Sequence, residues 1–150
     1  MSYTNTISSS IPEFIEQNLN LFNQFNEKEW EFKSSADKWS RKEMLGHLCD
    51  SAMTNIRRLI VSQHKQNEKI IYNQNEWVQY SDYQNMPVDE LIQLWRLLNR
   101  QYHRISQTIP PSSLDNTCDT SDIGISLKTL RFLIDDYWGH QEHHLKQILR

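Results

Sequence analysis

Three of the six histidines in this 150-residue chain lie within five positions near the C-terminus, at His140, His143 and His144. His140 and His144 are four residues apart, and this spacing places two side chains on one face of a helix, one turn apart. Two imidazoles in this relation can share a single divalent ion. Such an ion usually takes at least three protein ligands, so the pair needs a partner from another element.

The candidate for the third ligand is His47, in Leu45-Gly46-His47-Leu48-Cys49-Asp50. On a helical wheel it belongs to a polar ribbon beside an apolar face, which a purely structural helix does not need. The ribbon consists of His47, Asp50, Ser51, Thr54 and Arg58. An acceptor such as Asp50 could orient a ligating imidazole, and Arg58 could meet an anionic group of a substrate. Tyr137 is a candidate for a hydrogen bond at the rim of the site.

The other candidates for chemistry are weaker. His143 follows Asp136 and Gly139 on the more polar, solvent-facing side of the last helix, so we expect it to be exposed or at an interface. His64 and His103 are single residues in ordinary positions, and Cys49 is expected to be a small buried hydrophobe. Glu142 has the chemistry of a general base, but its stripe favours a solvated charge.

A structural interpretation of the histidines stays open at this point. Any two histidines in a helix have an appreciable chance of falling four residues apart. A histidine at the border of a core is often a hydrogen-bonded structural residue.

Helical periodicity predicts the elements that would position these residues. With only 3 Gly and 4 Pro, the chain is expected to be all-α, with four helices near 10–28, 40–65, 87–108 and 126–149 and no sheet of consequence. Ser40 and Glu43 match a capping box, and Ser126 is expected to be the N-cap of the last helix. Residues 66–86 are expected to form an irregular but ordered loop packed on the bundle. The simplest architecture is a four-helix bundle in a single domain, residues 1–150.

Composition narrows the classes of function. The net charge is −3 with interspersed signs, which is unlike the basic footprint of a nucleic-acid binder. Residues 1–6 have no signal-peptide pattern, and no apolar run approaches a membrane span. Cys49 and Cys118 fit a reducing cytoplasm rather than a disulfide framework. With 5 Trp and 5 Phe, one core is not expected to cover every ring, so we predict a homodimer.

Three stretches of the chain resemble a known family. Lys38-Trp39-Ser40-Arg41-Lys42-Glu43-Met44-Leu45-Gly46-His47-Leu48-Cys49-Asp50-Ser51 is similar to the Trp-Ser-x-x-Glu-x-x-x-His-Leu-x-Asp signature of the DinB/YfiT-like superfamily. Residues 135–148 resemble its closing helix with the His-x-x-x-His pair, and the middle section, residues 72–100, is also similar to members of the family. The resemblance therefore covers nearly the whole chain.

The resemblance implies a four-helix bundle of uncommon connectivity that is often dimeric. It implies a metal site with one histidine from the second helix and two from the fourth, here His47, His140 and His144. Related proteins include transferases and isomerases that use low-molecular-weight thiols such as bacillithiol or mycothiol.

Three hypotheses of function follow. The first is a metal-dependent enzyme, a hydrolase or a thiol S-transferase, acting on a small molecule. The second is a non-catalytic metal-binding or stress-response interaction module, and the third is a metal-free structural bundle. Zn, Ni and Fe(II) all accept imidazole ligands, so the residues alone do not choose the metal.

Overall fold

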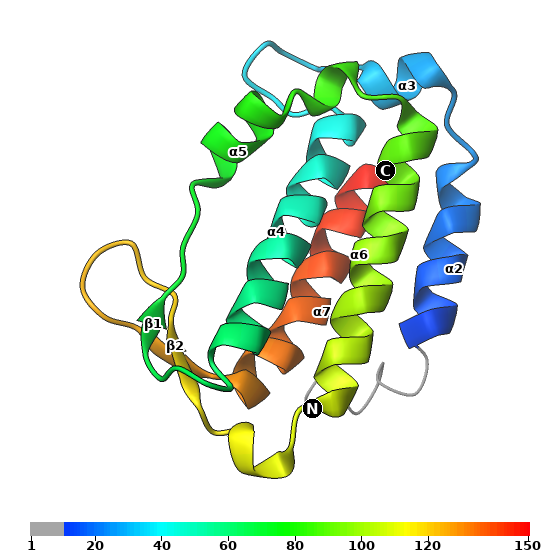
Figure 1. Ribbon diagram of the computed structural model, residues 1–150. Helices are drawn as coiled ribbons and strands as arrows, with labels where there is room; N and C mark the ends of the chain where they lie inside the picture. The colour runs from blue at the N-terminus through cyan, green and yellow to red at the C-terminus, as the bar shows by residue number, and fades with distance from the viewer. Residues whose placement is uncertain (1–10) are drawn as a thin grey trace.

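The structure is a computed structural model that describes residues 11–150. The predicted helix start at Ser10 and the N-terminal residues 1–6 lie outside this range. The four long helices are α2 (Ile11–Phe22), α4 (Arg41–Val61), α6 (Val88–Thr108) and α7 (Leu130–Ile148) (Figure 1). They form the predicted four-helix bundle around a shared hydrophobic core.

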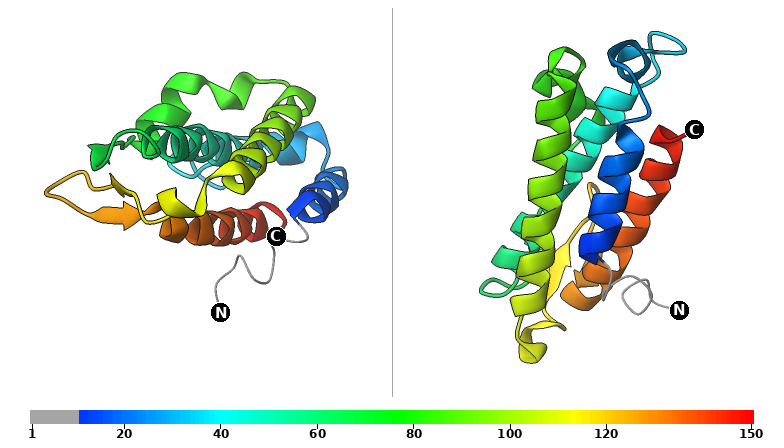
Figure 2. Two further views of the ribbon diagram at one scale, coloured as in Figure 1. Left: turned by 60° about the horizontal axis from the view of Figure 1, so that its bottom comes forward. Right: turned by 90° about the vertical axis from the view of Figure 1, so that its right-hand side faces the viewer.

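The order of the helices in space differs from a simple up-and-down bundle. Helix α4 packs against both α6 and α7, and α2 packs against α6. The colour gradient shows that α4 and α6 run in the same direction, whereas α2 and α7 run in the opposite one (Figures 1 and 2). Neighbouring parallel helices cannot be joined by a tight turn, so the chain needs a long crossover connection. That connection is residues 62–87, which we call the crossover segment.

The crossover segment is more regular than its sequence predicts. It contains the short strand β1 (Glu68–Lys69), helix α5 (Gln74–Ser81) and a 3-10 turn, η1 (Tyr83–Asn85). Asn73 begins α5, because its side chain accepts hydrogen bonds from the amides of Asn75 and Glu76. The expectation of an irregular loop is therefore wrong, but the expectation of an ordered segment packed on the bundle is confirmed.

The last helix begins later than predicted. Strands β2 (Thr117–Asp119) and β3 (Leu127–Thr129) form an antiparallel pair, and β1 adds to β2 in parallel. Because β3 takes residues 127–129 into this small sheet, Thr129 rather than Ser126 is the N-cap of α7. Leu127, which falls inside the helix predicted over 126–149, is instead a strand residue and is 45% exposed.

The first predicted helix is divided in two. Helix α2 ends at Phe22, and Asn26 forms a capping box with Glu29 that begins α3 (Glu27–Glu31). The turn between the helices brings Trp30 back against Phe22, with ring centroids 5.5 Å apart. The gain from burying this indole explains why one continuous helix over 10–28 is not formed.

Helix α4 carries the candidate ligand His47, and the sequence places its start correctly. Ser40 is the N-cap, and Ser40 and Glu43 form the predicted capping box. The helix ends at Val61 rather than near Lys65. Gly46 lets the crossover segment approach closely, because a Cβ on it would lie 2.1 Å from Cδ2 of Tyr83. The Tyr83 hydroxyl then donates a 2.6 Å hydrogen bond to Asp50.

Candidate metal centre

The structure brings His47 of α4 together with His140 and His144 of α7. Each offers one ring nitrogen, and these nitrogens lie within 4.8 Å of one another. The ring centroid of His47 is 5.4 Å from that of His140 and 4.9 Å from that of His144. Zinc–imidazole bonds are about 2.0–2.1 Å long, so nitrogens that share an ion lie up to about 4 Å apart. The three side chains are thus within a small adjustment of a common ligand sphere.

Of the three histidines, His47 gives the strongest indication of a bound ligand. It is 1% exposed, and neither of its ring nitrogens has a hydrogen-bond partner among the described residues. Leaving a buried polar group unpaired costs about 1–3 kcal/mol, so each such group calls for an explanation. A ligand that accepts the lone pair of one nitrogen would satisfy this ring, and the chemistry of three imidazoles fits a divalent ion.

Electrostatics keep the three rings in the form that binds metal. Burial, and then the neighbouring His140 and His144, lower the pKa of His47 to about 3. Burial and His144 lower the pKa of His140 to about 4, and burial also lowers the pKa of His144. All three are therefore neutral imidazoles at neutral pH, and only the neutral ring can coordinate.

Gln147 fixes the orientation of one candidate ligand. Nδ1 of His144 lies 2.9 Å from Oε1 of Gln147, one turn further along α7. When Nδ1 donates this bond, the lone pair of Nε2 is left for coordination. His143 is exposed, as its position on the helix predicts.

Two aromatic rings cover His47. Trp39 lies on it at a centroid distance of 5.1 Å, and Tyr72 of the crossover segment stacks at 6.5 Å. Trp77 of α5 in turn packs edge-on against Tyr72, at 5.8 Å. These rings shield the imidazole from water and hold its plane.

A pocket of about 200 Å³ opens beside the cluster. Its walls come from α4, α7 and the crossover segment, and they include His47 and His140. The other lining residues are Ser51, Asn55, Arg58, Tyr72, Gln74, Leu133, Asp136 and Tyr137. A small molecule in this pocket would lie directly against two of the three candidate ligands.

The three candidates for a role beside the ligands, Asp50, Arg58 and Tyr137, lie in different surroundings. Arg58 lines the pocket. Tyr137 also lines it, but its hydroxyl donates 2.7 Å to the buried Asn99 and so points into the core rather than to a rim. Asp50 accepts the hydrogen bond from Tyr83 and makes none with an imidazole of residues 11–150. Burial raises the pKa of Asp50 to about 6, and its Oδ2 has no hydrogen-bond partner among the described residues.

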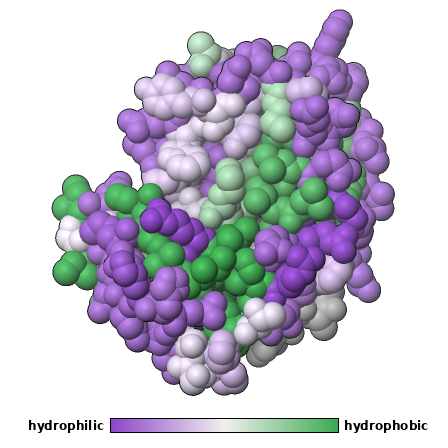
Figure 3. All heavy atoms as spheres, in the orientation of Figure 1, coloured by the Kyte–Doolittle hydropathy of each residue, from purple (hydrophilic) through white to green (hydrophobic). Residues whose placement is uncertain are grey.

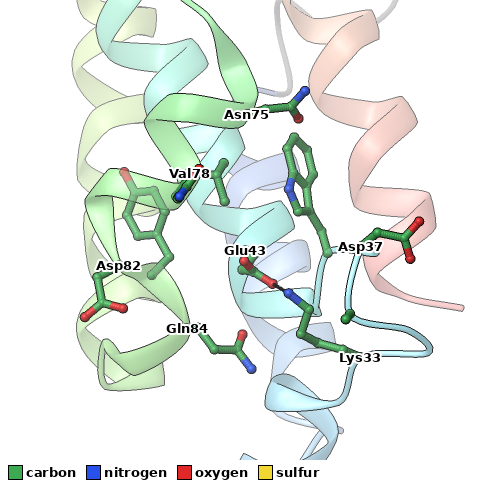
Figure 4. Close-up of a pocket in the computed structure, with 11 residues that line it drawn as sticks. Lys33, Asp37, Glu43, Asn75, Val78, Asp82 and Gln84 are labelled. Carbon is green, nitrogen blue, oxygen red and sulfur yellow. Dashed lines mark ion pairs between the residues drawn. The ribbon is translucent and has the colours of Figure 1, made fainter.

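A second pocket, of about 410 Å³, has Trp39 in its wall but none of the three clustered histidines. Figure 4 shows it in close-up. Figure 4 shows Lys33 and Glu43 paired at its edge, and their charged atoms are 2.8 Å apart. Asp37 and Asp82 lie on opposite sides of the opening. Since none of the three candidate ligands lines this second pocket, the pocket beside the histidines is the better candidate for chemistry.

Several residues of the site were not singled out from the sequence. Tyr72, Asn55 and Asp136 line the pocket, and Gln147 binds His144. Asp136 and Gln147 could have been found, because they lie one turn before His140 and one turn after His144. Tyr72 carries no such local signal, since the course of the crossover segment brings it to His47. Glu142, which has the chemistry of a general base, forms a surface ion pair with Lys146, with the charged atoms 3.3 Å apart.

The chain is similar to one known protein in sequence and to another in structure. The chain is 28% identical, over 112 residues, to a protein of Oceanobacillus iheyensis named "Putative metal-dependent hydrolase OB0782". The match covers 73% of this chain and 63% of that relative's length. The fold is similar to that of YfiT from Bacillus subtilis, described as "a probable metal-dependent hydrolase with an unusual four-helix bundle topology". The TM-score is 0.79 with 17% sequence identity, covering 95% of this chain and 80% of the other.

The match to a protein family extends over almost the whole chain. The family model is that of the DinB superfamily, and it matches residues 14–148, a range that includes all three clustered histidines. The chain therefore belongs to the DinB superfamily.

Proposed function

We propose that this protein is a metal-dependent hydrolase of small molecules, with one divalent ion held by His47, His140 and His144. The observation that carries the proposal is the buried, neutral and unpartnered His47 within ligand distance of a helical histidine pair. The names of the O. iheyensis relative and of YfiT support the same class. An ion with three imidazole ligands keeps positions open, which is typical of catalytic rather than structural sites.

When bound, such an ion acidifies a water molecule and so supplies a nucleophile near neutral pH. The rest of the chemistry falls to the chain itself. Trp39 and Tyr72 cover His47 and shield its ring from bulk water. Ser51 and Asn55 offer polar groups along the pocket wall, where they can orient a substrate. Asp136 lies at the same pocket and is exposed, so its carboxyl group can accept a hydrogen bond from a substrate.

The thiol S-transferase hypothesis uses the same ion with a cofactor thiol in place of water. None of the contacts described above favours it over hydrolysis, so hydrolysis, which the names of the relatives support, is the proposal. An activity screen with esters, amides and electrophiles, each with and without a low-molecular-weight thiol, separates the two reactions. A protein that binds metal but turns over no compound in this screen would agree with the non-catalytic module instead.

Metal stoichiometry tests the ligand set. We expect about one divalent ion per chain after reconstitution, most of its affinity lost in His144→Ala, and little change in His143→Ala. The reason is that two imidazoles hold such an ion poorly, whereas the exposed His143 lies outside the cluster. Loss of the ion in His143→Ala but not in His144→Ala would show that the assignment is wrong by one residue. The absence of metal from all three proteins would support the metal-free bundle.

A further inference from the structure

We infer that the pocket beside the three histidines selects an elongated substrate with a carboxylate at one end, and that Arg58 binds this carboxylate. The inference rests on the proposed function and adds the substrate class. The reacting end of the molecule would lie at His47 and His140, which line the same pocket as Arg58.

Arg58 is a half-buried cation without an acidic partner. Its Nε and Nη2 both donate to the carbonyl oxygen of Ile70, at 3.0 and 2.7 Å. No ion pair joins it to a carboxylate of residues 11–150. Burying a charge costs free energy unless it is paired, so a ligand that brings a negative charge would be stabilised here.

The hydrogen bonds to Ile70 also hold the guanidinium in place. Its remaining nitrogen, Nη1, is 3.5 Å from Oδ1 of Asn55, which is too long for a strong hydrogen bond. Arg58 therefore has donors to spare in a fixed position. A planar guanidinium with one positive charge matches the single charge and paired oxygens of a carboxylate.

The separation of His47 and Arg58 along α4 requires an elongated ligand. His47 and Arg58 are eleven residues apart, or three helical turns, so they lie on the same face with about 16 Å of helix rise between them. Long side chains on a helix lean toward its N-terminus, which brings the guanidinium back toward His47. Asp136 is the acidic residue in the pocket wall and would repel a carboxylate. Because Asp136 is exposed, solvent screens this repulsion.

Hydroxamates test the inference because they bind metal at one end and can carry a carboxylate at the other. The protein would be the full chain loaded with zinc, and affinities would be measured by calorimetry. The probes are the monohydroxamates of succinic, glutaric and adipic acids, with the corresponding carboxamides and acetohydroxamate as uncharged controls. We expect at least one carboxylate probe to bind about tenfold to a hundredfold more tightly than its carboxamide.

Variants then assign the preference to one residue. Arg58→Gln should abolish the preference for the carboxylate and leave the affinity for acetohydroxamate unchanged. The matched control is Arg57→Gln, because Arg57 carries the same charge at the next position but is exposed and does not line the pocket. Arg57→Gln should keep the preference. An equal preference in Arg58→Gln and wild type would overturn the inference.

A measurement on the wild type covers the case in which Arg58→Gln does not fold. Phenylglyoxal modifies accessible arginines, and peptide mass mapping reports the extent at each one. The tightest carboxylate probe should protect Arg58, and its carboxamide should not. Unchanged labelling of Arg58, or equal affinities for carboxylate and carboxamide, would overturn the inference but not the metal site. A chain that binds neither zinc nor acetohydroxamate would end the proposed function as well.

Discussion

Nδ1 of His144 and Oε1 of Gln147 lie 2.9 Å apart. Among residues 11–150, Gln147 is the side chain that holds one of the three clustered histidines by a hydrogen bond. In metal sites a partner of this kind fixes the tautomer of the imidazole and raises its basicity. The relation therefore predicts an effect on metal affinity from a residue that is not itself a ligand.

Replacing Gln147 with Leu should lower the affinity for zinc about tenfold to a hundredfold, because His144 loses the acceptor that holds Nδ1–H. Competition against a chelating dye measures this affinity. The control is Gln93→Leu, the same change at an exposed position of α6, and it should have no effect. Equal affinities in the two variants would contradict the role of Gln147.

Acid should destabilise the metal-free protein. The pKa values of His47 and His140 are lowered in the fold to about 3 and about 4, below the value of about 6.5 in the unfolded chain. Between these limits the unfolded state binds more protons, so the free energy of unfolding falls as the pH drops below about 6.5. Each histidine then contributes a loss of up to about 1.4 kcal/mol per pH unit.

Asp50 acts in the opposite direction. Its pKa is raised to about 6 in the fold, so below that pH the folded state holds a proton that the unfolded chain releases. Two histidines outweigh one aspartate, and the net effect of acid is a loss of stability. Urea unfolding in the presence of a chelator, from pH 7.5 down to pH 5, measures it. In His47→Asn the dependence on pH should be clearly weaker, and an unchanged slope would refute the assignment.

Gly46→Ala should destabilise the protein by about 1–3 kcal/mol. The new methyl group would meet the ring of Tyr83, whose nearest atom is 2.1 Å from the position of the Cβ. Moving the ring also removes the hydrogen bond to the buried Asp50. In a background of Tyr83→Ala the same change should be neutral or stabilising, because alanine favours a helix. A similar loss in both backgrounds would exclude the clash as the cause.

The predicted homodimer would cover hydrophobic surface that a single chain leaves exposed. Large side chains remain exposed, and Figure 3 shows hydrophobic residues gathered across the middle of one face of the molecule. The most exposed hydrophobic side chains are those of Ile123, Ile125, Tyr80, Phe32 and Leu97. Light scattering over a wide range of concentration should give twice the mass of the chain, and a constant monomer mass would refute the prediction.

The sequence predicts those features that depend on local spacing. The boundaries of α6 and the capping box of α4 follow from residues within one or two turns of each other. The grouping of His140 with His144 is also local, since four residues make one turn. Helical periodicity sorts side chains onto faces, and so His143 was separated from its neighbours correctly.

The features that the sequence does not predict depend on distant partners. Leu127 belongs to a strand because the neighbouring Thr129 pairs with Thr117, which lies twelve residues earlier in the chain. The sequence predicts that Asp50 accepts a hydrogen bond from an imidazole, whereas in the structure it accepts one from Tyr83 of the crossover segment. Tyr72 reaches His47 only because that segment recrosses α4. No local pattern encodes these encounters, since both partners must first be placed by the tertiary fold.

The parallel arrangement of α4 and α6 has a consequence for folding kinetics. In an antiparallel helical hairpin, the residues next to the turn meet early because they are close in the chain. Here the start of α4 lies beside the start of α6 (Figure 1), so every contact between the two helices spans tens of residues. Such non-local contacts require a loop to close before any contact is gained, and a high contact order slows folding. The chain should therefore fold more slowly than an up-and-down bundle of its size, and its rate should depend on the crossover segment that covers His47.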